Sequence, residues 1–586
     1  MIFESADLSW DKGQPFSKKY NDIYFSKDGA DEVERVFINP TNFNQLVRKN
    51  QLTSILELGF GSGLNFCVTA ERFLKQTSGN YLHFISFEKH PLTRIEYSRV
   101  FDNLVRKIPF SQQFLDQIPP RLKGWHRRKF ANGKIHLSLF FGDAAEGIED
   151  LASRQKIPID LCFLDGFSPS KNPELWDQGI FFDISKMLRK NSQISTFTVA
   201  SSVRKKLETI GFNLQRIDQR PIKRESLLGN FQLDIEKSKH SIPQEVNILG
   251  AGIAGTSLAR HLAEVGIIVR VWDPNGVATG ASKISASLLH GRLLGDQSLD
   301  ADFRAKAFHY SHNYLQQNQS FQKTGVLQLT GPNIDRDKMI RIKKAYPDSE
   351  EWLHILNQDE ARALAGTSID KPSALWFPDG GIVNMPLLCQ ELLDHPQIQF
   401  NQRSPDPAKP ITTLLATGAS EIINYPTGSL ETYSVSGQLD FVRLDNVPKI
   451  PIISDGYTIP LEKQLCALGA TYEHQALSPE EASRKNIETC FFTDSQHSEK
   501  HLRATRCVSS DRIPIIGKLD NDIWISGAHG SLGTSSAPFA ASIIASQIAG
   551  WVPPLSPEVM RRIQPQRFKE RQARRGKLVP LKRTID

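Results

Sequence analysis

The chain has few cysteines and no long apolar run. Its 586 residues include six cysteines, and no two of them form a Cys-x-x-Cys pair. This argues against a disulfide framework and against a cysteine-based metal centre, so we expect free thiols in a reducing compartment and no metal. No apolar segment reaches the roughly 18 residues that a membrane-spanning helix needs. Residues 1–7 lack a basic stretch followed by an apolar core, so we expect no secretory signal and a cytoplasmic protein without a membrane.

Repeats and low-complexity segments are also missing, and the composition is that of an ordinary globular protein, with 39% hydrophobic and 23% charged residues. The chain is longer than a single hydrophobic core can accommodate, so its length predicts roughly two to four domains. The net charge is uneven: it is +7 over residues 1–240, −8 over 241–560 and +8 over 561–586. Basic clusters that contain aromatics, such as Lys123–Lys129, suit a nucleic acid with exposed bases, although any single cluster can be a solvated charged face.

The pattern of the first half alternates strand and helix. We predict strands at 54–58, 82–87, 135–141, 159–164 and 193–199, with helices between them, for example at 64–74 and 91–103. Such alternation indicates a parallel sheet, whose ligands bind beyond the carboxyl ends of the strands. A polar linker at 236–244 precedes a second strand–loop–helix, and further strands are predicted at 325–330, 411–415, 434–443 and 523–526. The predicted domains are therefore 1–235, 245–560 and a basic tail at 561–586.

The first strand of the pattern runs into a glycine loop. Glu57 is followed by Gly59, Gly61 and Gly63, and then by a helix. This form is typical of S-adenosylmethionine enzymes, whose loop lets the backbone approach the cofactor, so we expect Glu57 and the three glycines to bind S-adenosylmethionine. The acids at the next two strand ends are Glu88, expected at the ribose, and Asp143, expected at the adenine amine; the alternative for each is a helix cap.

A third strand-end acid, Asp165, opens a loop bounded by glycine and proline. An amine must use its lone pair to be methylated, and a carboxylate can orient the amine and accept its proton. Asp165 is therefore the candidate catalytic residue of a methyl transfer. Phe167 and Trp176 can form a pocket wall or stack on a base, while core packing remains equally open for Trp176.

The second half opens on another glycine loop, with Gly250, Gly252 and Gly255 in the Gly-x-Gly-x-x-Gly form. These glycines and the helix that follows suit a pyrophosphate, and Asp273 at the next strand end can accept bonds from ribose hydroxyls. The loop alone does not separate FAD from NAD. The segments 413–418, with Gly418, and 506–533, with Gly530 and Gly533, resemble the closing parts of flavoproteins of the D-amino-acid-oxidase type, which favours FAD.

The string Asp165–Trp176 (Asp-Gly-Phe-Ser-Pro-x-x-Asn-Pro-x-x-Trp), with Asn21–Ser26 and Glu34–Phe37, resembles the methyltransferase half of the bifunctional tRNA 5-methylaminomethyl-2-thiouridine biosynthesis proteins. The flavoprotein segments resemble the second half of the same family. The resemblance implies an α/β fold: a Rossmann-like S-adenosylmethionine methyltransferase domain, followed by a D-amino-acid-oxidase-like FAD domain with an α+β substrate region.

The resemblance also implies two consecutive reactions on the wobble uridine of tRNA. The flavin half removes the carboxymethyl group from the carboxymethylaminomethyl substituent, and the methyltransferase half then methylates the aminomethyl product. Asp165 matches the acid that the family uses at the reacting amine, and Arg506 or Arg512 can pair with the substrate carboxylate. We expect a monomer.

The sequence departs from the family at Ser285 or Ala286, where a glycine is usual, and at Leu532, where arginine is common. These departures leave two alternatives open. One is a flavin-loaded tRNA methyltransferase whose oxidase half is inactive. The other is a small-molecule amine oxidase fused to a methyltransferase.

Overall fold

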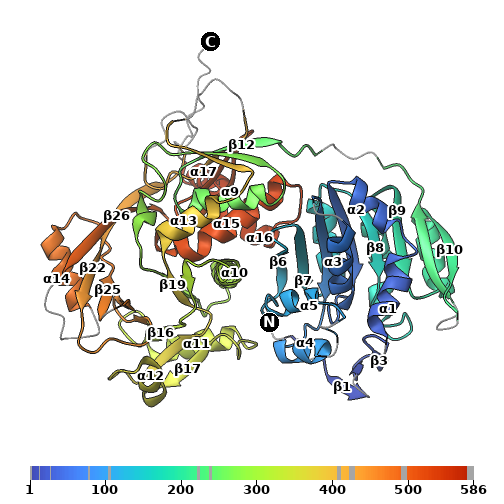
Figure 1. The fold of residues 1–586 in the computed structure, drawn as a ribbon, viewed down its shortest axis with the longest axis horizontal. Helices are drawn as coiled ribbons and strands as arrows, with labels where there is room; N and C mark the ends of the chain where they lie inside the picture. The colour runs from blue at the N-terminus through green and yellow to red at the C-terminus, as the bar shows by residue number, and fades with distance from the viewer. Residues whose placement is uncertain are drawn as a thin grey trace, which may run out of the picture. The chain divides into compact units, whose positions relative to one another are not determined.

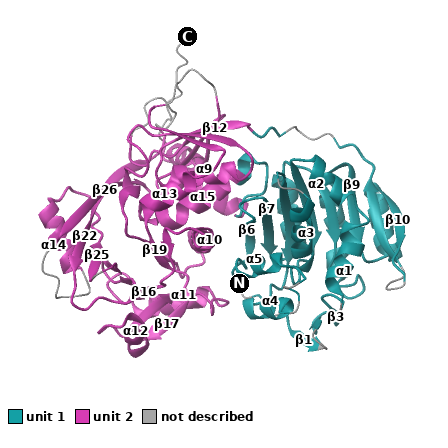
Figure 2. Cartoon of the chain, viewed as in Figure 1, with its two compact units in different colours: residues 1–242, 546–554 teal, residues 243–545, 555–586 magenta. Residues whose placement is uncertain are grey.

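A computed structural model describes the chain except for residues 1, 2, 5, 12, 13, 27, 77, 78, 103, 105, 106, 221–224, 236–239, 405–410, 421–428, 463, 490–497 and 577–586. The described residues form two compact units (Figure 2). Unit 1 comprises Met1–Ile242 and Ser546–Pro554, and unit 2 comprises Pro243–Ala545 and Leu555–Asp586. Within the described ranges, every helix is too short or too polar to cross a membrane.

Unit 1 is built on an eight-stranded sheet with the order β10-β11-β9-β8-β4-β5-β7-β6 (Figure 1). Its inner strands β9, β8, β4, β5 and β7 are parallel, whereas β6, β10 and β11 pair in the antiparallel sense. A three-stranded sheet of β1, β2 and β3 precedes it. The strand bounds are β1 (Leu8–Asp11), β2 (Gln14–Ser17), β3 (Asp22–Ile23), β4 (Leu52–Leu58), β5 (Tyr81–Glu88), β6 (Gly124–Phe130), β7 (Ile135–Phe141), β8 (Ile159–Leu164), β9 (Leu188–Thr196), β10 (Phe212–Asp218) and β11 (Glu225–Phe231).

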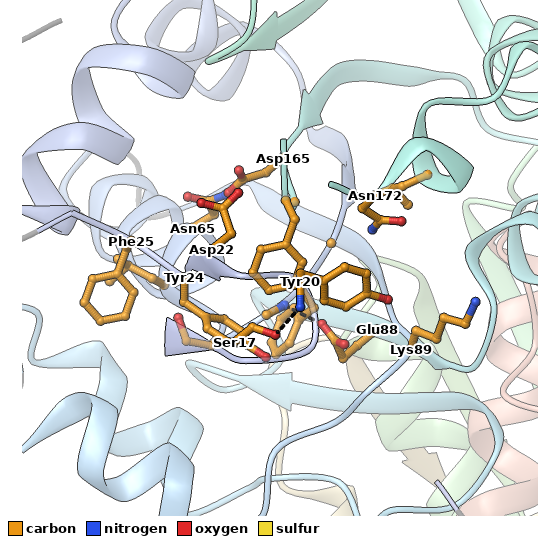
Figure 3. A pocket seen from close by; sticks show the side chains of 18 of the residues that line it. Ser17, Tyr20, Asp22, Tyr24, Phe25, Asn65, Glu88, Lys89, Asp165 and Asn172 are labelled. Carbon is orange, nitrogen blue, oxygen red and sulfur yellow. Dashed lines mark hydrogen bonds between the residues drawn. The ribbon is translucent and has the colours of Figure 1, made fainter. Parts of the chain in front are cut away.

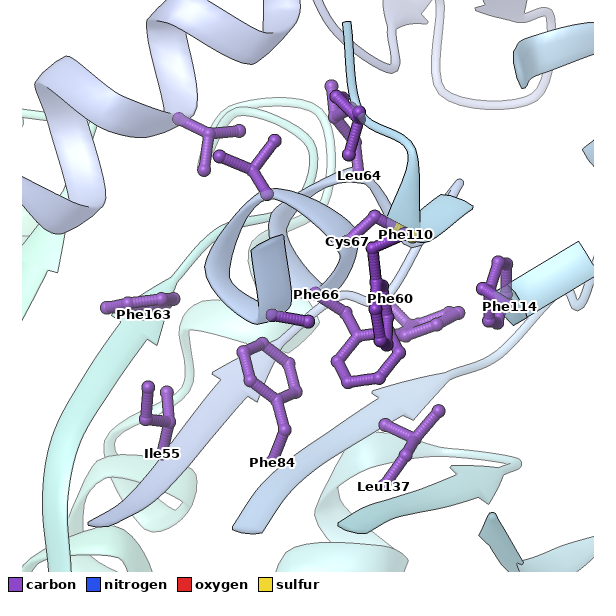
Figure 4. Close-up of a cluster of buried hydrophobic side chains, with 14 of the residues drawn as sticks. Ile55, Phe60, Leu64, Phe66, Cys67, Phe84, Phe110, Phe114, Leu137 and Phe163 are labelled. Atoms are coloured by element: carbon purple, nitrogen blue, oxygen red, sulfur yellow. The ribbon is translucent and has the colours of Figure 1, made fainter. Parts of the chain in front are cut away.

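Both faces of this sheet are covered, so the side chains of its central strands are buried at nearly every position, the polar ones included. On one face, Ile55, Phe84 and Phe163 pack with Phe66 and Phe114, in a cluster rich in phenylalanine (Figure 4). Their neighbours in sequence belong to a second cluster, on the opposite face. The helices are α1 (Gly29–Val33), the π-helical turn Glu34–Ile38, α2 (Phe43–Lys49), α3 (Leu64–Gln76), α4 (Arg94–Phe101), α5 (Phe110–Leu115), α6 (Ala144–Arg154), α7 (Gln178–Ser185) and α8 (Ser201–Thr209).

The segment Ser546–Pro554 is part of the packing of unit 1. The Trp551 ring is 4% exposed and lies 4.3 Å from the His83 ring and 4.8 Å from the His136 ring, measured between centroids. The guanidinium of Arg127 lies over the Trp551 ring and donates to the Val552 carbonyl at 2.8 Å. Unit 1 therefore depends on residues that lie more than 300 positions after its first segment.

Trp551→Ala is expected to destabilise unit 1 by about 3–5 kcal/mol, because it removes a large buried ring from between two histidines and an arginine. Thermal inactivation of the methyltransferase activity in the full chain measures the loss. Phe182→Ala is the matched control, because the Phe182 ring is 56% exposed and its removal should cost little. Equal midpoints for the two variants would contradict the structural role of Ser546–Pro554.

Unit 2 contains a six-stranded sheet with the order β20-β13-β12-β21-β28-β27, parallel except for β27. The strands are β12 (Glu245–Leu249), β13 (Ile268–Trp272), β20 (Ile398–Asn401), β21 (Thr413–Leu415), β27 (Ile515–Asp520) and β28 (Ile523–Gly527). The helices include α9 (Ile253–Ala263), α10 (Leu299–Leu315), α11 (Arg336–Ala345), α12 (Gln358–Ala365), α13 (Met385–Leu393), α14 (Pro479–Glu488) and α15 (Gly533–Ile548). Helix α9 follows β12 directly, as the glycine-loop pattern predicts.

Unit 2 also contains an eight-stranded sheet with the order β17-β18-β16-β23-β24-β25-β22-β26 and a three-stranded sheet with the order β14-β19-β15. This is the mixed α+β region that the sequence predicts after the dinucleotide loop. The strand bounds are β14 (Ser287–Leu289), β15 (Phe321–Gln322), β16 (Val326–Leu329), β17 (His354–Asn357), β18 (Ser373–Phe377), β19 (Gly381–Val383), β22 (Thr432–Arg443), β23 (Ile452–Ile453), β24 (Tyr457–Pro460), β25 (Leu465–Gly469) and β26 (Lys500–Ser509).

The described part of the basic tail folds onto unit 2 as α16 (Pro557–Ile563) and α17 (Gln566–Arg574). Arg567 is 7% exposed and donates to Asp511 at 3.0 and 3.1 Å, and Arg571 pairs with Glu431 at 3.1 Å. These two arginines therefore neutralise acids of their own unit. The remaining residues of the tail, 577–586, lie outside the described residues.

The structure changes the interpretation of the basic cluster at 123–129. It forms the edge strand β6, in which Trp125, Arg127 and Arg128 are 1%, 2% and 4% exposed. The interpretation as a nucleic-acid contact is wrong for these three side chains, because they are buried against other parts of unit 1. Within the linker predicted at 236–244, residues 236–239 lie outside the described residues, as does Cys490.

Candidate functional site

The loops after four adjacent strands of unit 1 meet around one cavity of about 340 Å³. Strands β8, β4, β5 and β7 are neighbours in that order, and their carboxyl ends lie at the same edge of the sheet. Asp165 follows β8, the glycine loop follows β4, Glu88 ends β5 and Asp143 follows β7. The cavity is lined by Asp165, Glu88, Asp143, Gly59 and Gly61 together. Its volume lies within the range of small-molecule sites.

The glycine loop lies close to the loop that carries Asp165. Gly59 has φ +80°, and a Cβ at this position would lie 3.0 Å from the Cα of Gly166. A side chain here would therefore be strained and would push the two loops apart. The backbone N–H of Gly61 donates to Oε2 of Glu88 at 2.7 Å, so the acid at the end of β5 also supports the loop.

Asp143 serves as a helix cap as well as a cavity residue. Its side chain accepts from the backbone N–H of Ala145 at 3.0 Å, at the start of α6. Lys89 lies 2.9 Å from Asp143 and 3.1 Å from Glu174, which belongs to the loop of Asp165. Burial raises and the Lys89 hydrogen bond lowers the pKa of Asp143, with a net decrease, so this carboxyl is ionised at neutral pH. The lysine links the predicted adenine side of the cavity to the loop that carries Asp165.

Glu57 lies beneath the glycine loop and is not among the residues that line the cavity. Its side chain is fully buried and accepts from the Ser86 hydroxyl at 2.6 Å. Burial raises the pKa of Glu57 well above its usual range, which favours the protonated carboxyl. The structure thus places Glu57 behind the site rather than at its surface.

Asp165 lies at the cavity wall with Asn65, whose Nδ2 donates to Oδ2 of Asp165 at 2.7 Å. Figure 3 shows these two side chains together and apart from Glu88 and Lys89. The cavity therefore has two chemically different ends. One end carries Glu88, Lys89 and Asp143, and the other carries Asp165.

Aromatic residues from the amino-terminal segment complete the cavity. The rings of Tyr20 and Phe167 stack with centroids 4.5 Å apart, and the Tyr24 ring meets Phe167 edge-on at 5.2 Å. The sequence predicts Phe167 in the wall of the pocket, but it gives no such role to Tyr20 or to Tyr24, although Tyr24 belongs to the string Asn21–Ser26. Trp176 is 2% exposed, donates to the Phe167 carbonyl at 3.0 Å and is absent from the lining, so its role is core packing.

In unit 2 the predicted dinucleotide residues also lie at one edge of a sheet. Asp273 follows β13, Gly250 follows β12, Gly418 follows β21 and Gly530 follows β28, and these four strands are adjacent. Gly530 lies in a short 3-10 turn that leads to Gly533, the first residue of α15. The order of strands explains how residues distant in sequence can serve one ligand.

The second glycine loop is packed against its own backbone. A Cβ on Gly255 would lie 1.8 Å from the carbonyl oxygen of Gly250. Gly252 is the N-cap residue of α9, and Asp273 accepts from the backbone N–H of Ala251 at 3.0 Å. A helix N-terminus with a close-packed glycine turn and an adjacent acid fits the pyrophosphate and ribose of a dinucleotide.

The remaining predicted residues of unit 2 lie in three places. Arg506 is a half-buried residue of β26 whose guanidinium donates to the Thr471 carbonyl at 3.2 Å. Leu532 ends the 3-10 turn that starts at Gly530, and Ser285 is exposed in the segment before β14. Across the described residues, no cluster of three or more His, Cys, Asp and Glu side chains could hold a metal.

Two histidines of unit 2, His290 and His529, predict a pH dependence. Burial lowers the pKa of His290 to about 3 and that of His529 to about 4, below the roughly 6.5 of an unfolded histidine. As the pH falls below about 6.5, the unfolded chain binds protons first, so unit 2 loses stability progressively down to about pH 4. Melting curves of unit 2 at pH 7, 6, 5 and 4 measure this loss. His529→Gln should flatten the slope, and an unchanged slope would contradict the prediction.

Comparison with known proteins supports the predicted methyltransferase half and the predicted flavin half. Residues 107–232 match a family model described as S-adenosyl-L-methionine-dependent methyltransferase, and residues 245–398 match one described as FAD dependent oxidoreductase. The protein from Marinobacter nauticus named tRNA 5-methylaminomethyl-2-thiouridine biosynthesis bifunctional protein MnmC is 29% identical, over 96% of this chain and 97% of its own. The protein of the same name from Idiomarina loihiensis is 29% identical, over 95% of this chain and 98% of its own.

Among solved structures, the match with glycine oxidase from Bacillus cereus covers 52% of this chain and 95% of that protein, with 20% identity and a TM-score of 0.44. The two family models occur in the order that the sequence predicts, and the relatives match along nearly the whole chain. The predicted fold class and both predicted cofactors, S-adenosylmethionine and FAD, are confirmed. The chain is an S-adenosylmethionine-dependent methyltransferase followed by an FAD-dependent oxidoreductase, and along nearly its whole length it is similar to the bifunctional tRNA 5-methylaminomethyl-2-thiouridine biosynthesis proteins.

Proposed function

We propose that the chain carries out two consecutive reactions on the wobble uridine, position 34, of tRNA. The flavin half converts 5-carboxymethylaminomethyl-(2-thio)uridine to 5-aminomethyl-(2-thio)uridine, and the methyltransferase half converts that product to 5-methylaminomethyl-(2-thio)uridine. The catalytic domains are residues 1–235 and 245–560, with a linker at 236–244 and a basic tail at 561–586; within the second range, Ser546–Pro554 packs in unit 1. The chain acts as a monomer in the cytoplasm, where tRNA is found.

The observation that carries the proposal for unit 1 is the cavity that joins the glycine loop to Asp165. S-adenosylmethionine, when bound, supplies an electrophilic methyl group. Gly59, Gly61 and Gly63 hold its methionine part, Glu88 binds the ribose hydroxyls and Asp143 lies near the adenine. Glu57 supports the loop from behind, through its contact with Ser86.

Asp165 is the residue that acts on the substrate amine. With the methyl donor bound, the amine nitrogen would form a bond to the methyl carbon while the sulfur–carbon bond breaks, and the electron pair of that bond would remain on sulfur. The product nitrogen then carries one proton too many, and the Asp165 carboxylate accepts it. Tyr20 and Phe167 offer apolar surface for the pyrimidine that bears the amine.

In unit 2, Gly250, Gly252 and Gly255 with the N-terminus of α9 hold the pyrophosphate of FAD, and Asp273 holds a ribose hydroxyl. Gly418, Gly530 and Gly533 close the site at the adjacent strand ends. FAD, when bound, accepts the hydride in the oxidation of the substrate C–N bond. Arg506 pairs with the substrate carboxylate through a bidentate contact, which orients the carboxymethyl group. Water then splits the oxidised substrate into a two-carbon fragment and the free aminomethyl group.

Nucleoside analysis of tRNA from a strain that lacks this gene tests the proposal. We expect carboxymethylaminomethyl uridine to accumulate, and the intact gene to restore the methylated product. Aminomethyl uridine as the accumulated nucleoside would indicate that the flavin half is inactive in this chain. Unchanged tRNA would favour a small-molecule substrate and would overturn the proposal.

A further inference from the structure

Asn65 connects the glycine loop to Asp165. It is the second residue of α3, two positions after Gly63 of the glycine loop, and it is 6% exposed. Its amide donates to Oδ2 of Asp165 at 2.7 Å, across the cavity wall that Figure 3 shows. The contact therefore joins the loop after β4, which faces the methyl donor, to the loop after β8, which faces the methyl acceptor.

The chemical nature of this partner suits a proton acceptor. A hydrogen bond to a carboxylate favours the ionised form and restricts the side chain to one orientation. A lysine or arginine in the same place would also fix the carboxylate, but its positive charge would reduce the basicity strongly. A neutral amide orients the carboxylate with a smaller loss of basicity. Asn65 is thus a better neighbour for a base than a cation would be.

The buried carboxyl of Glu57, behind Asn65, is also consistent with a role of Asn65 in orienting Asp165. Glu57 is fully buried, and Ser86 donates to its Oε2 at 2.6 Å. Burial raises the pKa of Glu57 well above its usual range and the negative charge of Asp165 adds to that increase, while hydrogen bonds with Ser86 and Asn65 oppose it. A protonated Glu57 does not repel an ionised Asp165. Asn65 therefore lies between a buried carboxyl that favours its neutral form and the carboxyl at the cavity wall.

We propose that Asn65 is a positioning residue for methylation, whose amide holds the Asp165 carboxylate in the orientation and ionisation state in which it accepts the proton of the amine. This inference rests on the proposed role of Asp165 and adds a residue that does not itself touch the reacting atoms. During the transfer, the amine nitrogen gains the methyl carbon, the sulfur keeps the electron pair of the broken bond and the proton goes to Asp165. Asn65 exchanges no proton in this scheme.

The test compares Asn65→Ala and Asn65→Asp in the full chain, with tRNA that carries the aminomethyl group and S-adenosylmethionine. We expect kcat to fall roughly 10- to 100-fold in both variants, because the base loses the hydrogen bond from the Asn65 amide, which helps to orient it. The acidic limb of the pH–rate profile should move to higher pH, because a hydrogen bond that favours the ionised carboxylate is lost. The KM for S-adenosylmethionine should change less than about threefold, because the contact affects the chemical step.

Asn80→Ala is the matched control, since the Asn80 amide also makes one hydrogen bond in unit 1, to the Val47 carbonyl at 2.6 Å, away from the cavity. It should leave kcat and the pH profile unchanged. The aspartate variant keeps the shape of Asn65, so it remains informative where the alanine variant melts at a lower temperature.

Three outcomes separate the claims. Normal kcat and a normal pH profile in both Asn65 variants, with an inactive Asp165→Asn variant, would overturn the role of Asn65 alone. A rise in the KM for S-adenosylmethionine with unchanged kcat would assign Asn65 to the cofactor and would also overturn it. Full activity of Asp165→Asn would instead remove the proposed function of Asp165, on which the inference rests.

Discussion

Asp165→Asn is expected to slow methylation by roughly 100- to 10,000-fold, the range that a positioned acid–base group contributes. The amide has nearly the same shape as the carboxylate but cannot accept the proton that the product nitrogen must lose. The loop geometry should persist, because the backbone N–H of Asp165 still donates to the Leu58 carbonyl at 3.2 Å. Single-turnover methylation of tRNA with the aminomethyl group measures the effect.

Two controls make this result specific. The affinity for S-adenosylmethionine, measured by calorimetry, should change less than about threefold, since the predicted cofactor contacts lie on other strands. Asp177→Asn alters an acid at the end of the same loop, which caps α7 through the Gly179 N–H at 2.8 Å and does not line the cavity. That variant should methylate normally. A normal rate for Asp165→Asn would remove Asp165 from the mechanism.

Gly255→Ala is expected to abolish FAD binding and with it the removal of the carboxymethyl group. The new Cβ would lie 1.8 Å from the Gly250 carbonyl oxygen, far inside contact distance, so the turn before α9 must open. Pyrophosphate recognition by this turn requires close packing of helix and strand. The purified variant should lack the visible flavin spectrum and should still methylate tRNA that already carries the aminomethyl group.

Gly280→Ala is the matched control for this change. Gly280 has φ −81°, and no heavy atom would lie within 4 Å of its new Cβ, so the variant should retain flavin. A flavin content of Gly255→Ala equal to that of the parent would contradict the assignment of this loop to FAD. Loss of methylation in the same variant would indicate that the methyltransferase activity depends on an intact flavin site.

The sequence predicts the elements that carry the cofactor loops well, because their signals are local. Strands β7 (Ile135–Phe141) and β8 (Ile159–Leu164) have the predicted bounds, and α3 starts at the predicted Leu64. The gathering of Glu88, Asp143 and Asp165 around one cavity also follows from a parallel sheet. The order of strands that makes them neighbours is set by long-range packing.

What the sequence misses is decided by contacts between distant segments. The sequence around Arg127 predicts a solvated charge. The side chain is instead buried, because Trp551 and Val552, which lie more than 400 residues further along the chain, cover it. Arg567 likewise belongs to a basic tail by composition, but Asp511 fixes it in place. Such pairings carry no local signal, so charge patterning alone overestimated the surface available to nucleic acid.

The aromatic wall is a further case. Tyr20 directly precedes the string Asn21–Ser26, for which the sequence shows only a family resemblance, and its stacking on Phe167 joins the amino-terminal segment to the loop of Asp165. No periodicity in the sequence predicts this contact, since the residues involved are 147 positions apart and lie in loops. Glu57, by contrast, was expected at the cofactor, and the structure places it below the loop with Ser86.

The most direct test of the account is a two-stage reaction of the full chain with tRNA that carries 5-carboxymethylaminomethyl-2-thiouridine. Under anaerobic conditions without S-adenosylmethionine, the tRNA should bleach the flavin absorbance and the aminomethyl nucleoside should appear. Addition of S-adenosylmethionine should then convert that nucleoside to its methylated form. A flavin spectrum that stays oxidised, with the carboxymethylaminomethyl nucleoside intact, would contradict the central claim that both halves act in sequence on one uridine.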